Sequence, residues 1–374
     1  MIINDTVLKY DEKVIFALRE LYSRYGYSQY KMSKFEEYDL YVRNKDFLIS
    51  DGVITFTDTN GRLMALKPDV TLSIIKNSKD IPGFVQKLYY DENVYRVSDR
   101  THTFKEIMQV GLECIGDIDD YSILEVVSLA AKSLVKISDS SVLDISHLGI
   151  LSAMFDLAGI PESDRDRIMK LVGEKNVHEL ERECRGLGVE DDYTEQIKAL
   201  VSTYGAPKTV LPRLKELLCD EAFAEPLSQL ENIVASLDGD EYSHIIRIDF
   251  SVISDIKYYN GIVFKGFISG IPQSVLSGGQ YDRLMRKMQK RSGAVGFAVY
   301  LDLLERLISE SRKYDVDTVI LCDRTANVST VRKAVEEYAA KGSVSVQRSL
   351  PDKYTYKRLV RISEGEVTEI EENT

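Results

Sequence analysis

Apolar residues near the N-terminus recur at the spacing of a helix and then lose that period. The repeat consists of Val14, Leu18, Leu21 and Tyr25. Residues three or four positions apart share one helical face, so this repeat predicts a helix with one buried side that ends at Gly26. The next stretch, residues 27–41, is rich in aromatic side chains and lacks a helical period. It is predicted to be extended.

Short runs of alternating apolar residues follow and predict strands. They cover residues 53–58, 63–66, 87–90, 92–97 and 104–115. Asn60-Gly61 lies between the first two runs and favours a hairpin turn, because both residues tolerate a positive φ. Pro68 suits the first turn of a helix that continues through Ile75. This part of the chain therefore predicts antiparallel strand pairs with a helix between them.

The middle of the chain changes to helical patterns. An acidic run, residues 117–120, precedes an apolar-faced helix at residues 123–135, which suits the positive end of a helix dipole. From residue 149 to residue 238, short helical stretches are broken by Gly and Pro, and strand patterns are absent. These residues are predicted to form a helical insertion, after which a strand resumes at residues 244–250.

A strand, a glycine pair and a helix are predicted between residues 254 and 307. The strand is indicated by the apolar residues Ile262, Phe264 and Phe267. Gly278-Gly279 indicates a tight turn or a close approach of the backbone to a ligand. Residues 296–307 are predicted to be helical, since apolar side chains would share one face. Those side chains are Leu301, Leu304 and Ile308.

The last part of the chain predicts a smaller unit of its own. Strand patterns occur at residues 317–321, 344–347, 358–362 and 366–370, and a helix is predicted at residues 329–340. We therefore expect a core at residues 1–312, which contains the helical insertion, and a small C-terminal α/β segment at residues 313–374.

Composition excludes several classes of protein. The chain has 374 residues, 44% of them hydrophobic, and a formal net charge of −12, which argues against a dominant nucleic-acid surface. Four scattered cysteines and four histidines lack metal-ligand spacing, so we expect reduced thiols, no metal site and no cofactor. No apolar run is long enough to span a membrane, and the N-terminus lacks a signal pattern. The expectation is a cytoplasmic protein.

Polar residues in two of the predicted strands are candidates for a ligand site. Arg96 has a planar guanidinium that suits a carboxylate or a phosphate. Gln109 and Glu113 are four positions apart, so a strand would place both side chains on one face. A glutamate in a pocket can accept a strong hydrogen bond from an imidazole N–H. The alternative is a solvated polar face of an antiparallel strand. Gly111 between them favours a ligand that approaches the backbone.

Asp69 and three tyrosines also have two interpretations. Asp69 is either a ligand-binding carboxylate or the cap of the helix that follows it. The tyrosines are Tyr258, Tyr259 and Tyr281. Each could be a core aromatic, but the glycine pair before Tyr281 favours the wall of a polar pocket.

Four stretches, in this order, resemble the motifs of histidyl-tRNA synthetases over roughly residues 8–307. Leu66-Lys67-Pro68-Asp69-Val70-Thr71 is similar to that family's Leu-Arg-Pro-Glu-Gly-Thr, in which the acid binds the substrate's α-amino group. The stretch from Arg96 to Glu113 resembles class II motif 2 in its histidyl form, Phe-Arg-x-Glu … Phe-x-Gln-x-Gly-x-Glu. Tyr258-Tyr259 and Gly278-Gly279-Gln280-Tyr281-Asp282 resemble Arg-Gly-Leu-Asp-Tyr-Tyr and Gly-Gly-Arg-Tyr-Asp. The stretch from residue 296 resembles the third class II motif.

The chain departs from this family where the family has positive charge for adenylation. Ser254 and Leu303 stand where the family's patterns have arginines, and Ser98 replaces the acid after the motif 2 arginine. Adenylation stabilises charge on ATP with Arg or Mg²⁺, so these changes predict that the chemistry is lost. Lys257 stands where the family has Asp and is no obvious replacement. Arg306, three residues after Leu303, would share roughly its helix face.

A synthetase-like fold with a histidine pocket and without adenylation arginines resembles the regulatory subunits of ATP phosphoribosyltransferase. The resemblance implies an α+β, class II aminoacyl-tRNA synthetase-like antiparallel sheet flanked by helices, and a C-terminal segment like a shortened anticodon domain. It implies a non-catalytic chain that binds free histidine, partners a short catalytic subunit and also self-associates. The implied histidine ligands are Asp69, Thr71, Arg96, Gln109, Glu113, Tyr258, Tyr259 and Tyr281.

Two alternatives stay open at this point. One is a divergent histidyl-tRNA synthetase, which would need adenylation arginines and a basic face for tRNA. The acidic composition favours no tRNA partner. The other is a free-standing histidine-binding paralogue with a different partner, which the residues do not separate from the regulatory subunit.

Overall fold

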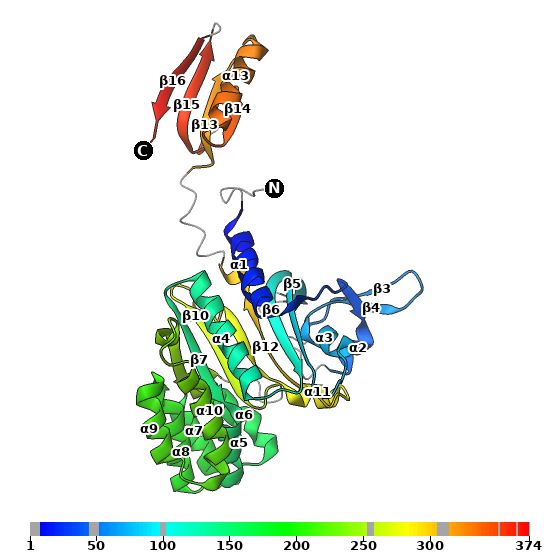
Figure 1. Ribbon diagram of the computed structural model, residues 1–374, viewed down its shortest axis with the longest axis vertical. Coiled ribbons are helices and arrows are strands. Elements are labelled where there is room, and N and C mark those ends of the chain that lie inside the picture. The colour runs from blue at the N-terminus through cyan, green and yellow to red at the C-terminus, as the bar shows by residue number, and fades with distance from the viewer. Residues whose placement is uncertain are drawn as a thin grey trace. The chain divides into compact units, whose positions relative to one another are not determined.

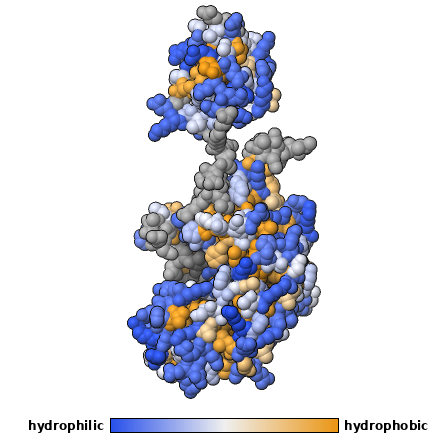
Figure 2. Space-filling view, turned by 90° about the vertical axis from the view of Figure 1, so that its left-hand side faces the viewer, coloured by the Kyte–Doolittle hydropathy of each residue, from blue (hydrophilic) through white to orange (hydrophobic). Residues whose placement is uncertain are grey.

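The structure is a computed structural model that divides the chain into two compact units, Met1–Arg306 and Leu307–Thr374 (Figure 1). It describes residues 8–44, 52–97, 102–252, 258–304, 314–350, 352–363 and 366–373. Hydrophilic residues cover most of the face seen in Figure 2, with apolar residues in smaller patches between them. Among the described residues, no helix combines the length and the apolar character needed to cross a membrane.

A nine-stranded mixed sheet forms the centre of the larger unit. Its order is β1-β5-β6-β12-β11-β10-β7-β9-β8 in the described part of the chain. The strands are β1 Ser28–Gln29, β5 Val85–Val97, β6 Phe104–Gly116, β7 Ser141–His147, β8 Tyr204–Gly205, β9 Ile246–Asp249, β10 Ile262–Ile268, β11 Leu276–Gln280 and β12 Gly293–Tyr300. Pairing is antiparallel from β5 through β7, and the pairs β1–β5 and β7–β9 are parallel.

Two helices cover the apolar face of this sheet, α1 Tyr10–Arg24 and α4 Asp120–Ile137 (Figure 1). Three of the four apolar residues predicted to form the buried side of the first helix are buried. Tyr22 of α1 also shares a 3.0 Å hydrogen bond with Ser133 of α4. Asp119 caps α4 by accepting from the backbone N–H of Ser122, as expected for a carboxylate at a helix start. Both helices confirm the sequence predictions.

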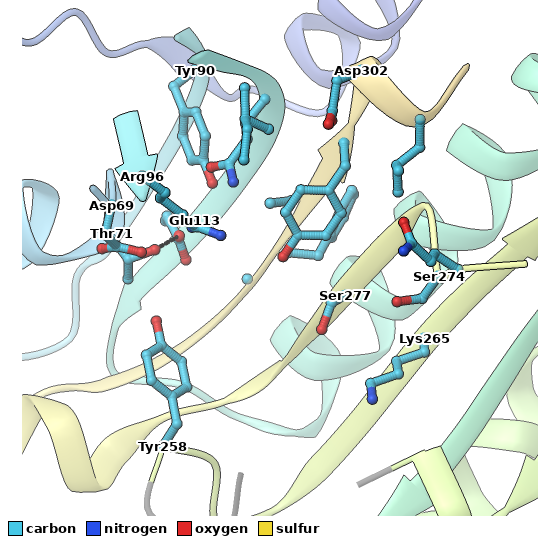
Figure 3. A pocket seen from close by; sticks show the side chains of 18 of the residues that line it. Asp69, Thr71, Tyr90, Arg96, Glu113, Tyr258, Lys265, Ser274, Ser277 and Asp302 are labelled. Atoms are coloured by element: carbon cyan, nitrogen blue, oxygen red, sulfur yellow. Dashed lines mark hydrogen bonds between the residues drawn. The ribbon is translucent and has the colours of Figure 1, made fainter. Parts of the chain in front are cut away.

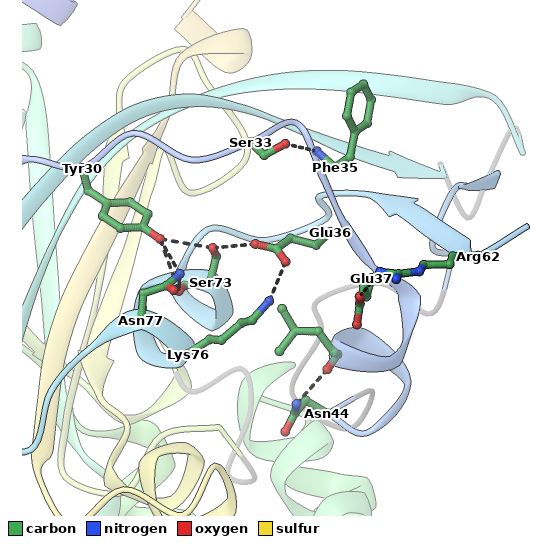
Figure 4. Close-up of polar contacts among 11 residues, drawn as sticks. Tyr30, Ser33, Phe35, Glu36, Glu37, Asn44, Arg62, Ser73, Lys76 and Asn77 are labelled. Atoms are coloured by element: carbon green, nitrogen blue, oxygen red, sulfur yellow. Dashed lines mark hydrogen bonds and ion pairs between the residues drawn. The ribbon is translucent and has the colours of Figure 1, made fainter. Parts of the chain in front are cut away.

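A small three-stranded sheet lies beside the large one and carries α3 Thr71–Asn77 (Figure 1). Its strands are β2 Phe35–Glu37, β4 Leu63–Leu66 and β3 Thr55–Thr57. Glu36 of β2 binds Lys76 of α3 at 2.8 Å and accepts from Ser73 at 3.2 Å (Figure 4). These bonds fix α3, and therefore Thr71, relative to the small sheet.

One segment near this small sheet differs from its prediction. Residues 38–41 were predicted to be extended but belong to a short helix, α2 Tyr38–Val42. Tyr41 of this helix is fully buried in a cluster with Leu72 and Ile75 of α3. Tertiary packing therefore overrides the strand preference of the aromatic residues.

The predicted helical insertion is present between β7 and β9 (Figure 1). Its helices are α5 Leu148–Leu157, α6 Glu162–Gly173, α7 Val177–Gly186, α8 Asp191–Ser202, α9 Pro207–Leu217 and α10 Ala224–Ser236. The two-residue strand β8 interrupts it, which the sequence did not indicate. β8 pairs with β9 and closes one edge of the large sheet.

Two further predictions within the large sheet are wrong. Residues 87–90 and 92–97 form one continuous strand, β5, because it pairs with β6 without a break, Asp91 included. The Asp91 carboxylate is paired with Arg19 of α1 and accepts from Gln29. Residues 296–300 belong to β12 rather than to a helix, and a single 3₁₀ turn follows at Leu301–Leu304. Most of β12 is buried, which removes the alternation that marks a half-exposed strand.

The smaller unit has a four-stranded sheet, ordered β14-β13-β15-β16, and one helix. The elements are β13 Val316–Cys322, α13 Val328–Ala339, β14 Val344–Gln347, β15 Tyr356–Ser363 and β16 Glu366–Glu372. Ile320, Val360 and Tyr338 of α13 form its core. Each predicted element of this unit is present within a few residues of its expected bounds.

Candidate functional site

A cavity of about 530 Å³ opens on the polar face of the large sheet. Its size lies within the range of about 300–1,000 Å³ that is common for small-molecule sites. All eight side chains implied as histidine ligands line it: Asp69, Thr71, Arg96, Gln109, Glu113, Tyr258, Tyr259 and Tyr281. They come from α3 and the turn before it, β5, β6, the segment before β10 and the end of β11.

The floor of the cavity is made of small residues on β12, which is next to β6, and on β11, which is next to β12. Glu113 of β6 is paired with Gly296 of β12, and Gly296 with Gly279 of β11. Two residues away along the same strands, toward the other side of the cavity, Ala298 of β12 is paired with Ser277 of β11. Because paired residues in a sheet point to the same face, these short side chains leave a hollow between the larger ones.

Glycine is required at several points of this floor. A Cβ at Gly296 would overlap the Oε2 atom of Glu113, and one at Gly279 would lie 2.8 Å from the Tyr259 ring. Gly278 faces the other side of the sheet, where a Cβ would meet Phe264 and Phe297. The glycine pair therefore lies inside β11 and forms no turn, contrary to one of its two predicted interpretations. The close approach is to backbone and side-chain atoms of the protein.

Glu113 is held between two hydroxyl groups at one side of the cavity, and Figure 3 shows the bond to Thr71. Thr71 Oγ1 donates to Oε1 at 2.6 Å, and the Tyr281 hydroxyl donates to Oε2. Burial raises the pKa of Glu113 to about 8, nearby Asp69 raises it too, and the two hydroxyl groups oppose the shift. A buried carboxyl with a raised pKa gains when a cationic or N–H-bearing ligand stabilises its charged form.

The cap interpretation of Asp69 is confirmed, and its role toward a ligand stays a prediction. Its Oδ1 accepts from the backbone N–H of Leu72 at 2.8 Å, in the first turn of α3, and the residue also lines the cavity. Burial raises the pKa of Asp69, against the Leu72 bond and the positive charge of Arg96. Arg96 donates from Nε to the carbonyl of Pro68 at 2.9 Å, which pins the turn that carries Asp69.

Gln109 adds an amide group to the same cavity. Its side chain is 3% exposed and lines the cavity. An amide carries both hydrogen-bond donors and an acceptor, so it suits a polar ligand.

The three tyrosines form one aromatic wall. The rings of Tyr258 and Tyr259 meet edge to face with centroids 4.6 Å apart, and those of Tyr258 and Tyr281 are 5.7 Å apart. The same rings pack against the apolar core that includes Leu72 and Ile75. They are therefore core aromatics on one side and cavity wall on the other, which unites the two interpretations.

Sequence reasoning missed other side chains of the cavity. They include Tyr90, Lys265, Gln273, Ser274, Ser277, Tyr300 and Asp302. For Lys265 a signal existed, because it is the one charged residue in the strand Ile262–Ile268. The seryl and tyrosyl positions carried no such signal.

Of the substitutions that predict lost adenylation, only the one at Leu303 lies within the described residues. Leu303 lines the cavity, in place of the family's arginine. Ser98, Ser254, Lys257 and Arg306 lie outside the described residues. Within the described ranges, no three His, Cys, Asp or Glu side chains gather in a way that could hold a metal ion.

Comparisons with known proteins agree with this geometry. A family model described as histidyl-tRNA synthetase matches residues 6–304. Eight curated relatives named ATP phosphoribosyltransferase regulatory subunit are 24–29% identical to the chain. The relative from Oceanobacillus iheyensis is 29% identical over 79% of this chain and 73% of its own length.

Solved structures share the fold. An ATP phosphoribosyltransferase regulatory subunit/histidyl-tRNA synthetase from Bacillus halodurans C aligns with a TM-score of 0.75 at 22% identity, covering 94% of this chain and 93% of that one. A chain of the ATP phosphoribosyl transferase (HisG:HisZ) complex from Thermotoga maritima aligns with a TM-score of 0.62 at 18% identity, covering 77% and 96%. The predicted class II synthetase-like α+β fold is confirmed, with a sheet that is mixed at its edges. Because the family model spans most of its length, this chain belongs to the histidyl-tRNA synthetase family.

Proposed function

We propose that this chain is the non-catalytic regulatory subunit of ATP phosphoribosyltransferase, in the cytoplasm, and that it binds free histidine in the cavity around Glu113. The observation that carries the histidine site is the pair formed by Glu113 and Gln109 on one face of β6. The first is a buried carboxyl that gains from an N–H donor, and the second is an amide that lines the same cavity.

Histidine supplies a complementary group for each polar side chain of this end of the cavity. Its imidazole N–H suits Glu113, its α-ammonium suits Asp69, and its α-carboxylate suits Arg96. Both acids have a raised pKa, with burial as the main cause, so each is stabilised in its charged form by a cationic partner. The tyrosine wall supplies flat aromatic surface beside the ring.

A regulatory role, in place of catalysis, is supported by the relatives' name and by Leu303. Adenylation places negative charge in the transition state that Arg or Mg²⁺ must stabilise. Leu303 lines the cavity where the family's pattern has an arginine, and its side chain supplies no charge. The chain therefore keeps the residues proposed to bind histidine and lacks the arginine that the family's pattern has at this position for adenylation.

Regulation requires a catalytic partner that is a separate chain. The Thermotoga maritima neighbour comes from a two-component complex, which supports a hetero-oligomer here with a short catalytic subunit. Self-association of this chain is a further part of the proposal. Histidine must bind one state of that assembly more tightly than another, since an effector with equal affinity for both shifts nothing.

Calorimetry on the purified chain tests the histidine site. Wild-type protein should bind free histidine, and Glu113→Ala should weaken the dissociation constant by roughly 10- to 100-fold, as expected for the loss of one charged hydrogen bond. Glu216→Ala, at an exposed position of α9, is the matched control and should bind like wild type. No heat with histidine, or equal affinity for both variants, contradicts the proposal.

A further inference from the structure

The cavity has a second polar end that the histidine site does not use. Figure 3 shows Asp69, Thr71 and Glu113 together on one side, and Lys265, Ser274 and Ser277 on the other. Lys265 of β10 is paired with Ser277 of β11, and three strand spacings separate β10 from β6 in the sheet. At about 4.8 Å per spacing, the two ends lie roughly 14 Å apart across the sheet.

Lys265 has no anionic partner within the parts of the chain that the structure describes. Asp144 of β7 lies opposite it in the strand pairing, but the cations that act on the Asp144 carboxylate are Lys175 and Arg247. Burial lowers the pKa of Lys265, and no carboxylate opposes that shift. Placing an uncompensated charge in a partly buried site is costly, so natural proteins usually pair it.

The other two cations that line the cavity are differently placed. Arg96 is bonded to the Pro68 carbonyl beside Asp69, and Lys105 is exposed at the start of β6. Lys265 alone combines burial with the lack of a described partner. Ser277 beside it on β11 and Ser274 in the preceding turn add hydroxyl groups, which can donate to the same anion.

We propose that Lys265, Ser274 and Ser277 form an anion-binding subsite, which takes the phosphate or carboxylate group of a second small molecule while histidine occupies the Glu113 end. The anion-binding subsite stands without the proposed function, and only the statement that histidine occupies the Glu113 end rests on it. The cavity volume of about 530 Å³ supports two occupants, because histidine is smaller than the drug-sized ligands that cavities of this size hold. A lysine point charge with nearby hydroxyl donors suits a phosphate oxygen.

Thermal unfolding of the full chain tests the subsite with simple anions. Wild type is compared with Lys265→Met in chloride, phosphate and acetate at equal ionic strength. Lys208→Met, which removes an exposed charge in the helical insertion, is the matched control. Phosphate or acetate should raise the Tm of wild type and of Lys208→Met by about 2 °C or more over chloride, and Lys265→Met should lose that gain. The anion that stabilises more identifies the source as phosphate or carboxylate.

Lys265→Met should fold, since it removes a cation that has no anionic partner among the described residues. Lys265→Arg should restore the anion effect if charge is what matters. Titration of the stabilising anion should show about tenfold weaker binding to Lys265→Met. The anion effect should persist in saturating histidine. Equal anion effects in Lys265→Met and wild type, an absence of any effect in wild type, or competition between the anion and histidine would overturn the separate subsite. If wild type does not bind histidine, the histidine site is contradicted, and the anion measurements still test the subsite.

Discussion

Gly296 of β12 lies directly opposite Glu113 of β6, and the space where its side chain would be is filled by the Glu113 carboxylate. The backbone carbonyl of Leu112 lies close to the same point. A methyl group at position 296 therefore has no room unless Glu113 moves. The glycine sets the position of the carboxyl group as firmly as the hydroxyl groups of Thr71 and Tyr281 do.

Gly296→Ala should disable the histidine end of the cavity. The new methyl group displaces Glu113 from its two hydroxyl partners, so histidine affinity should fall by at least about tenfold, the value of one charged hydrogen bond. The unfolding free energy should fall as well, by about 1–3 kcal/mol, because of overpacking in a buried strand. Calorimetry and chemical denaturation measure the two effects.

The matched control is Gly186→Ala at the end of α7. Nothing lies within 4 Å of the position that its Cβ would take, so the change should leave histidine binding intact. It should stabilise the chain by roughly 0.4–1 kcal/mol through the unfolded state. Wild-type histidine affinity in Gly296→Ala would show that Glu113 is not held where the structure has it.

Glu113 should make the chain less stable as pH rises toward 8. Its pKa is about 8 in the folded chain against an ordinary value of 4.5, so the folded state binds more protons than the unfolded state between those values. Stability from this group is full below pH 4.5 and is lost as pH rises through 8. Asp69 and Asp144 also have raised pKa values and act in the same direction.

The contribution of Glu113 is isolated by Glu113→Gln, which cannot ionise. The Tm difference between this variant and wild type should grow in the variant's favour from pH 5 to pH 9, by several degrees. Thermal unfolding at fixed ionic strength across this range measures it. Parallel Tm curves for the two proteins would contradict the raised pKa.

Tyr281→Phe should remove one of the two hydrogen bonds that hold the Glu113 carboxyl group. It removes the hydroxyl that donates to Oε2, and that hydroxyl lowers the pKa of Glu113. The pKa should therefore rise further, and histidine should bind about tenfold more weakly. Tyr121→Phe, at an exposed tyrosine of α4, is the control. Unchanged affinity in Tyr281→Phe would assign that tyrosine to the core alone.

Most of the candidate site could be predicted from the sequence, because the placement of its residues depends on local structure and motif order. A strand puts Gln109 and Glu113 on one face whatever surrounds it, and the motif order links that strand to Asp69 and the tyrosines. The prediction of a helix at residues 296–307 failed where the chain is buried on both sides, because a short apolar run does not distinguish a buried strand from a buried helix. The Lys265 end was missed because it depends on which strands become neighbours, and β10 reaches β6 only through β11 and β12.

Loss of adenylation gives a prediction about chemistry. Since Leu303 supplies no charge in the cavity, the purified chain should not exchange pyrophosphate into ATP in a histidine-dependent way. Isotope exchange with an active histidyl-tRNA synthetase as the positive control measures this. A clear histidine-dependent signal would favour the divergent synthetase over the regulatory subunit.

The regulatory role requires that histidine bound to this chain change the activity of a second chain, the catalytic subunit. Mixing the chain with its cognate catalytic subunit should give a larger species on gel filtration, with activity that histidine inhibits. Coupling between two ligands is reciprocal, so substrates of the complex should weaken histidine binding by the same factor by which histidine weakens theirs. Glu113→Ala should blunt inhibition and leave the larger species intact, because Glu113 is 2% exposed and a side chain so deeply buried offers little surface to a partner. Two separate peaks, with activity indifferent to this chain, would leave a histidine-binding paralogue with a different partner.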